Sequence, residues 1–212
     1  DSIFKAFKRK ETFATTGTRL AVRFFAGYDM NAIELDSENM VQEAYAKGVT
    51  MGADLFASDN QTPQFLVWAQ RDKNGAPLQR IQIIKGWVEN GSGTPHETVY
   101  DVACSDGLTV DPLTNRCPDN GARVNINDCS ISDDAGAVEL KTTWTDPKFD
   151  PTIKAFYYVR VLENPTCRWS TWDAVKAGVT PRPDLHQTIQ ERGWSSPIWY
   201  IPEQSKIDIN IL

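Results

Sequence analysis

Residues 155–162, AFYYVRVL, are the stretch that decides the fold. Aromatic and β-branched side chains fill it without a glycine or a proline, and that composition is typical of a β-strand. Residues 64–70 (QFLVWAQ) and 78–85 (LQRIQIIK) have the same character, and the polar stretch that ends at Pro77 indicates a turn between them. In 78–85 polar side chains alternate in part with isoleucines, so we expect one face of this strand to meet water.

Shorter segments around these three complete a mainly β pattern. Strands are expected at 13–16, 19–25, 98–103, 137–143 and 196–201. Helical spacing of apolar residues is confined to 2–10, 37–47 and 169–176. Gly48 is predicted to end the second helix as its C′ residue. Short strands separated by glycine and proline favour a β-sandwich, so we predict a mainly β fold with a short N-terminal helix and one or two small inserted helices.

The composition is that of a folded, acidic chain. Of its 212 residues 41% are hydrophobic and 24% are charged, and 28 acidic against 22 basic side chains give a net charge of −6. This balance argues against a nucleic-acid-binding protein, whose binding surface is normally basic. No apolar stretch approaches the roughly 20 residues that span a bilayer. We therefore expect neither a nucleic-acid partner nor a membrane span.

Four cysteines, Cys104, Cys117, Cys129 and Cys167, show no zinc-binding spacing. Three of them lie in residues 101–134, a stretch rich in Pro, Asp, Asn and Gly that can contribute little to a hydrophobic core. Disulfide bonds would stabilise such a stretch by about 2–4 kcal/mol each, and they would indicate a periplasmic or secreted protein. Four reduced thiols in a cytosolic protein are the alternative. Of the possible pairings we favour Cys117 with Cys129 and Cys104 with Cys167.

Few residues are candidates for contact with a substrate. His96 precedes Glu97, and the two have the chemistry of an acid–base pair or of metal ligands, although an exposed loop histidine gives the same pattern. Trp87, Trp169 and Trp172 stand near polar or turn residues, so their rings are candidates for stacking on sugar faces. The alternative for these rings is packing within the sandwich or at its edges.

Two further patterns bear on ligands, one for a cation and one for an anion. Asp111, Asp119 and Asp128 supply oxygen atoms of the kind that calcium prefers, but their spacing matches no EF-hand and Asp is also an ordinary turn residue. Arg19 follows a Thr/Gly turn and has the chemistry to receive an anionic group, with a salt bridge at a domain junction as the alternative. No nucleophile elbow, phosphate-binding loop or His-Glu-x-x-His motif occurs, so we assign the chain no catalytic residue and no cofactor.

Several separated motifs resemble one bacterial protein family. They are KRKETFATTGTRLAVRFFAGYD, FLVWAQRDKNGAPLQRIQIIKGWVENG, HETVYDVACSDG, FDPTIKAFYYVRVLENPTCRWSTWDA and TIQERGWSSPIWY. Together they resemble the C-terminal third of the domain-of-unknown-function family numbered thirty-six-zero-four. That family is similar to metal-dependent hydrolases of the polymerase-and-histidinol-phosphatase (PHP) type. The resemblance runs from about Ser2 to Pro202.

The resemblance implies that this chain accompanies a catalytic barrel. Family members look like metal-dependent hydrolases of the phosphoesterase type, with a divalent metal held by His-x-His and Asp-x-His motifs that this sequence lacks. Residues 1–12 would be the final helix of that barrel, residues 13–202 its β-sandwich companion and residues 203–212 a tail. The companion would be non-catalytic, would cap the barrel, and would shape the substrate cleft with Arg19 near the barrel mouth. The upstream barrel is the expected partner, and exposure of the apolar residues of the first helix favours a homo-oligomer in its absence.

A free-standing, exported module is the rival interpretation. Such a module would bind glycans through Trp87, Trp169 and Trp172, or would assemble through its edge strands. Binding of a polysaccharide by the chain alone would support the module, whereas a His-x-His motif upstream would support the hydrolase companion.

Overall fold

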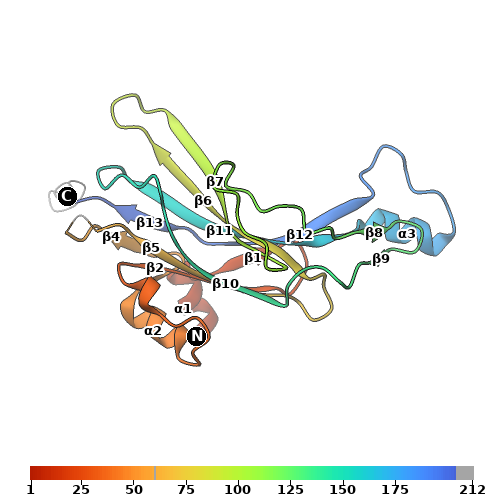
Figure 1. The fold of residues 1–212 in the computed structure, drawn as a ribbon, viewed down its shortest axis with the longest axis horizontal. Helices are drawn as coiled ribbons and strands as arrows, with labels where there is room; N and C mark the ends of the chain where they lie inside the picture. The colour runs from red at the N-terminus through yellow and green to blue at the C-terminus, as the bar shows by residue number, and fades with distance from the viewer. Residues whose placement is uncertain (60, 204–212) are drawn as a thin grey trace.

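The computed structural model describes residues 1–59 and 61–203, which form two packed β-sheets with short helices at the edges (Figure 1). The large sheet has seven strands, which are β1 (Phe13–Thr15), β4 (Asp54–Phe56), β6 (Leu78–Val88), β7 (Pro95–Cys104), β11 (Ala155–Cys167), β12 (Thr188–Ser195) and β13 (Ile198–Ile201). The small sheet has four strands, which are β2 (Ala21–Gly27), β3 (Gly48–Thr50), β5 (Gln64–Gln70) and β10 (Glu139–Thr145). The predicted fold class, a mainly β sandwich with small helices, is confirmed.

The remaining elements lie around the two sheets. They are α1 (Ser2–Lys8), the 3-10 helix η1 (Met30–Ala32), α2 (Met40–Lys47), α3 (Trp169–Ala177) and the two-stranded pair β8 (Val124–Asn125) and β9 (Ser130–Ile131). Residues of η1 and α2 pack against the small sheet, where Phe25, Met30 and Leu66 belong to a second, smaller core. Figure 1 shows α3 at one end of the long axis and the β6–β7 hairpin toward the other.

Strand β11 is the centre of the large sheet. It pairs with β6 along most of its length, with β13 at its beginning and with β12 at its end. Ala155, Tyr157 and Val159 are buried against the small sheet, and the residues between them are partly exposed on the outer face. The strand continues past the predicted residues 155–162 to Cys167, with a shift in register between Leu162 and Pro165 that accommodates the proline.

The main core lies between the two sheets and is built around aromatic rings. Phe65 of β5 contacts Tyr157 of β11, with 4.4 Å between ring centroids, and stacks on Phe24 of β2 at 5.8 Å. These three side chains have no more than 1% of their surface exposed. The core therefore joins the two sheets directly, as expected for a sandwich.

A charged pair is buried at one end of this core. The Lys85 ammonium donates to Asp146 Oδ2 at 2.5 Å and to the Lys148 carbonyl oxygen at 2.8 Å. The Tyr157 hydroxyl donates to the same Asp146 oxygen at 2.9 Å, and burial together with this carboxylate raises the pKa of Tyr157 far above its ordinary value. Lys85 and Asp146 are almost fully buried, so each charge depends on the other.

Two local predictions about the second helix need correction. The helix begins at Met40, not at residue 37, and the backbone before it forms turns. Gly48 is no left-handed C′ residue, because its φ of −165° is extended and it starts β3. Glycine is required there for space, since a Cβ atom would lie 2.2 Å from the Ala26 carbonyl oxygen.

All four cysteines form disulfides, as predicted, but the favoured pairing is wrong. The bonds join Cys104 to Cys117 and Cys129 to Cys167. Residues 105–136, here called the cystine segment, fold back over the outer face of the large sheet, so each bond ties the segment to a strand end. The Cys117 N–H donates to Asp101 of β7 at 2.8 Å, which brings residue 117 beside the end of that strand.

The N-terminal helix is described in full, whereas most of the predicted C-terminal tail is not. Helix α1 covers most of the predicted residues 2–10, but none of its side chains is buried. Of the predicted tail, residues 204–212 lie outside the described residues. No helix of the described part is long and apolar enough to cross a membrane.

Candidate ligand-binding groove

A groove of about 730 Å³ lies where the β6–β7 hairpin meets β11 and β13. Trp87, His96, Phe156 and Trp199 are among the residues that line it, and we call it the aromatic groove. Phe156 lies on the outer face of the large sheet, whereas the Trp87 ring packs against the main core. Its volume is in the range of small-molecule sites, and its apolar lining with a few polar groups is typical of them. Two of the predicted contact residues, Trp87 and His96, thus lie together.

The strand register places the rings. Trp87 of β6 is paired with His96 of β7, and the two rings stack at 5.2 Å between centroids. Phe156 is paired with Gly86, and a Cβ at residue 86 would lie 2.2 Å from the Phe156 ring. Gly86 therefore lets the Phe156 ring lie over the strand, where it meets Trp199 of β13 at 5.1 Å.

Charged groups surround the rings. His96 Nε2 lies 3.9 Å from Glu89 Oε2, and the Lys154 ammonium lies over the Trp199 ring at 5.6 Å from its centroid. Burial and the nearby Glu97 carboxylate raise the pKa of Tyr158, which follows Phe156 on the outer face. Rings that offer flat apolar faces, with carboxylate, ammonium and imidazole groups beside them, suit the binding of a polar molecule with apolar faces.

The predicted contact residues Arg19, Trp169 and Trp172 lie elsewhere. The Arg19 backbone N–H donates to Asp72 Oδ2 at 2.9 Å. The pKa of Asp72 is lowered by hydrogen bonds from Asn74 and from Arg19, so Arg19 stands beside a carboxylate and does not line the groove. Trp169 is 69% exposed at the start of α3. It thus lies at the end of the long axis opposite the hairpin (Figure 1).

The three calcium candidates each serve their own turn. Oxygens of Asp111, Asp119 and Asp128 accept backbone hydrogen bonds from residues two positions later, at 2.8–3.0 Å. These bonds lower the pKa of Asp111 and of Asp128. Within residues 1–59 and 61–203, no group of three or more His, Cys, Asp or Glu side chains is arranged to hold a metal ion.

Phe156 and Trp199 were missed as groove residues because they lie in apolar strands that the sequence places in the core. In AFYYVRVL, every second side chain points to the same face of the strand, and this spacing could have identified Phe156 as an outward-facing residue. Arg160 marks the outward face of β11, and Phe156 and Tyr158 share that face with it at intervals of two residues. A pairing of Phe156 with a glycine in the next strand could not be read from the sequence, because it depends on strand register.

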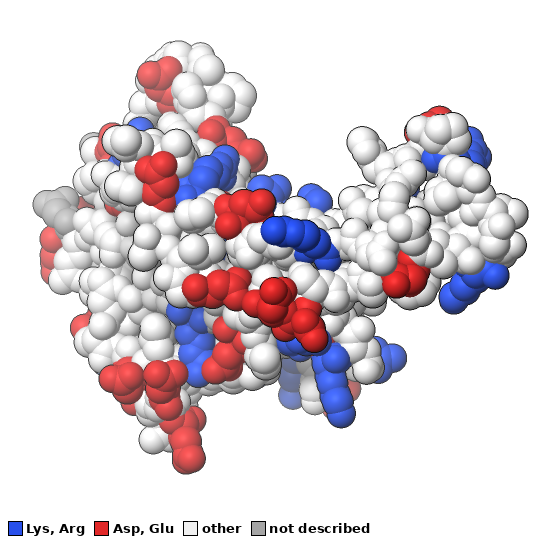
Figure 2. Space-filling view, turned by 45° about the vertical axis from the view of Figure 1, so that its right-hand side comes forward, with Lys and Arg blue, Asp and Glu red and all other residues white. Residues whose placement is uncertain are grey.

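The surface carries charges of both signs. Figure 2 shows acidic and basic side chains interspersed over one face of the molecule, with no broad basic patch on the described residues of that face.

Comparison with known sequences places the chain in a family. A family model described as "Protein of unknown function (DUF3604)" matches residues 1–202, which include every helix and strand from α1 to β13. No curated protein and no solved structure gives a significant match. The chain therefore belongs to the DUF3604 family of proteins of unknown function.

Proposed function

We propose that this chain is the non-catalytic β-sandwich companion of a PHP-like, metal-dependent hydrolase of the phosphoesterase type. The sandwich caps the catalytic barrel and helps to shape its substrate cleft, in the periplasm or outside the cell. Support for the hydrolase comes from the resemblance of the sequence motifs, and support for export comes from the two disulfides. The observation that carries the docking role is the surface of α1.

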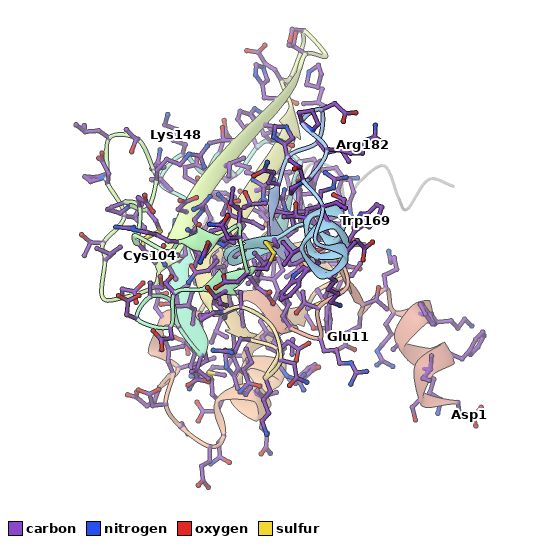
Figure 3. All side chains as sticks on the ribbon, turned by 90° about the vertical axis from the view of Figure 1, so that its right-hand side faces the viewer. Asp1, Glu11, Cys104, Lys148, Trp169 and Arg182 are labelled. Atoms are coloured by element: carbon purple, nitrogen blue, oxygen red, sulfur yellow. A yellow bond between two sulfur atoms is a disulfide. The ribbon has the colours of Figure 1, made fainter. Side chains whose placement is uncertain are left out.

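Helix α1 presents a bare apolar face. Ile3, Phe4 and Phe7 are 75%, 66% and 66% exposed, and Figure 3 shows the helix, which starts beside Asp1, standing off from the sheets. A helix of seven residues is too short to be stable in water on its own. Burial of each large apolar side chain contributes about 1.5–3 kcal/mol, so a domain that covered this face would stabilise the helix.

The chain that leaves α1 is attached to the sandwich. Arg9 Nη2 donates to Glu11 Oε2 at 2.9 Å, and the Tyr45 hydroxyl donates to the other oxygen of that carboxylate. A Cβ at residue 52 would lie 2.2 Å from the Lys10 carbonyl oxygen, so the chain can pass there only because residue 52 is glycine. These contacts fix the point from which α1 leaves the sandwich, which suits a helix shared between two domains.

The hydrolase assignment is tested on the longer polypeptide that the proposal requires. The coding region upstream should contain His-x-His, and the purified longer protein should carry divalent metal and hydrolyse a phosphoester such as p-nitrophenyl phosphate. EDTA should abolish the activity, and the 212-residue chain alone should show none. Stoichiometric transition metal bound by the 212-residue chain would contradict the proposal, as would a longer protein with neither metal nor hydrolysis.

The aromatic groove favours a second candidate function, the binding of glycans. The Phe156 and Trp199 rings lie 5.1 Å apart, and the Glu97 and Lys154 side chains beside them offer an acceptor and donors for sugar hydroxyls. Aromatic faces flanked by hydrogen-bonding groups are suited to sugar rings.

A polysaccharide panel with the chain alone tests this function. Trp199→Ala should weaken any binding by about tenfold or more, because it removes an aromatic face of the groove. Trp169→Ala is the matched control, since Trp169 is exposed but does not line the groove. Absence of binding to every glycan, or equal losses in both variants, would exclude glycan recognition by the groove.

A further inference from the structure

A second, more polar cavity lies at the opposite end of the long axis, where β12 and the end of β11 meet α3. It has a volume of about 400 Å³. The cationic or potentially cationic side chains in its lining are Arg168, Arg192 and His186, and the amides are those of Gln79 and Gln190. Among the described residues that line it, Asp119 is the only acid, and that carboxylate already accepts the Gly121 N–H at 3.0 Å.

Arg168 is the unusual member of this lining. Its Nε is buried without a hydrogen-bond partner, and among the described residues its guanidinium forms no ion pair. Buried donors are nearly always satisfied, and an unpaired donor on a charged group is costly. A guanidinium that is left unpaired beside a cavity is therefore prepared to donate to a group that enters the cavity.

Among residues 1–59 and 61–203, the second arginine of the lining, Arg192, also has no carboxylate partner. Its Nε donates to the Gln190 carbonyl oxygen at 3.2 Å. Burial lowers the pKa of Arg80 on β6, and the charges of Arg116, Arg160 and Arg192 lower it further against the opposing effect of Asp101. The buried carboxylate of Asp101 lies between Arg80 and Arg116 and is engaged by both. Positive charge is thus in excess on this part of the large sheet.

The walls of the cavity are held in place by several bonds. The Arg168 N–H donates to the Gln187 carbonyl oxygen at 2.9 Å, and the Thr171 hydroxyl donates to the same oxygen at 2.8 Å. Gln190 Nε2 donates to Gln79 Oε1 at 2.9 Å, which joins β12 to β6. The Cys129–Cys167 bond fixes the residue directly before Arg168. A site held in this way loses little conformational freedom when it binds a ligand.

We propose that this cavity binds an oxyanion, a phosphate, sulfate or carboxylate group of a small ligand, between the guanidinium groups of Arg168 and Arg192. Guanidinium binds such groups with two parallel N–H···O bonds, and Arg168 and Arg192 both line the cavity. The Gln79 and Gln190 amides, which bond to each other, are the neutral polar groups of the lining. The site does not depend on the function proposed above, because it involves neither α1 nor the aromatic groove.

The test is a calorimetric titration of the 212-residue chain with inorganic phosphate, sulfate and acetate at constant ionic strength. Arg168→Gln and Arg192→Gln should each weaken binding of the preferred anion by about tenfold or more. Arg182→Gln is the matched control, because Arg182 lies in the neighbouring loop, is paired with Asp184 and does not line the cavity. It should change the affinity by less than about twofold. Tighter binding of phosphate and sulfate would identify a tetrahedral ligand group, and tighter binding of acetate a carboxylate.

A measurement on the unmodified chain guards against variants that fail to fold. The Arg168 Nε–Hε resonance should shift as the anion is added, while that of Arg182 should stay in place. The proposal is overturned if no anion moves the Arg168 resonance, or if Arg168→Gln and Arg182→Gln bind the anion equally well.

Discussion

The sandwich and the cystine segment are stable for different reasons. The sandwich buries a continuous set of large side chains from both sheets, including Phe24, Phe65 and Tyr157. In the cystine segment, residues 105–136, the buried hydrophobic residues are only Cys129 and Ala135, although the whole segment is described. Apolar burial thus accounts for the sheets, whereas the segment depends on two disulfides and on polar contacts to the sheet.

The polar contacts of the segment converge on two residues. The carboxylate of Asp101 on β7 accepts hydrogen bonds from Gln82 Nε2 at 2.6 Å and from the Cys117 N–H at 2.8 Å. Asn120 Nδ2 donates to Ser105 Oγ at 3.1 Å and to Asn164 Oδ1 at 2.9 Å. The two regions therefore differ in their response to reducing conditions. The sandwich core should not depend on them, whereas the cystine segment should.

Within the 212-residue chain, the largest expected effect is on the sandwich. Asp146→Ala leaves the Lys85 ammonium buried without its carboxylate, so the free energy of unfolding should fall by about 4 kcal/mol. Asp150→Ala is the control, because Asp150 serves an exposed turn, and should cost less than about 1 kcal/mol. Urea unfolding followed by tryptophan fluorescence measures both. Similar losses of unfolding free energy in the two variants would show that the buried Lys85–Asp146 pair contributes no more to stability than an exposed turn.

A smaller loss is expected where the segment meets the sheet. Asp101→Asn removes the charge that faces Arg80 and Arg116, and should destabilise the protein by about 3 kcal/mol. Amide exchange should accelerate most at Cys117, whose N–H donates to Asp101. Asp111→Asn, in an exposed turn, should leave exchange at Cys117 unchanged. Unaltered Cys117 exchange in Asp101→Asn would mean that the segment is held elsewhere.

Loss of one disulfide should separate the two regions. Replacing both Cys129 and Cys167 with Ser should cost about 2 kcal/mol, and should expose the segment while the sheets stay folded. Limited proteolysis with mass spectrometry should locate the first cuts within residues 105–136, and far-UV circular dichroism should be unchanged. First cuts in β5 or β11 would contradict the idea that the regions are stabilised independently.

The smallest effect concerns pH. Glu163 is 1% exposed, and its burial raises its pKa above the ordinary value. Folding therefore favours the protonated form, so this contribution to stability is present at low pH and is lost as the pH rises through the raised pKa. Glu163→Gln should therefore gain stability relative to the parent as the pH rises from the ordinary glutamate pKa to the raised pKa. The gain should be about 1.4 kcal/mol for each pH unit that separates the two pKa values. If the unfolding free energies of the parent and of Glu163→Gln changed with pH in the same way, the proposed contribution of Glu163 would be refuted.

Residue composition and turn residues were enough to predict the longest central strands. The strands around 64–70, 78–85 and 155–162 are β5, β6 and β11, because aromatic and β-branched side chains fill them between turn residues. The strands β3, β4, β8 and β9 were missed, since two or three residues each carry no periodicity. The longer β12 was missed too, because TIQERGWS is mostly polar and contains a glycine. Gly48 was assigned to the wrong role because a glycine needed for space and one needed for a left-handed backbone look alike in sequence.

The sites were less accessible than the fold because they depend on contacts between distant segments. Trp87 and His96 were identified as candidates, yet only the β6–β7 register stacks their rings. Arg168 was not identified, since its significance is an unpaired donor in a cavity that three separate segments close. The disulfide pairing failed for the same reason, because it follows from the path of the cystine segment across the sheet.

The proposed docking of α1 can be tested by one measurement in two contexts. Phe4→Ser with Phe7→Ser should leave the unfolding free energy of the 212-residue chain within about 0.5 kcal/mol, because both rings are exposed there. In the longer protein the same pair should cost about 6 kcal/mol, since both rings would be buried against the barrel. Leu113→Ser, at a residue that is 92% exposed in the cystine segment, should have little effect in either. An equal, small effect of the double substitution in both proteins would contradict the companion-domain account.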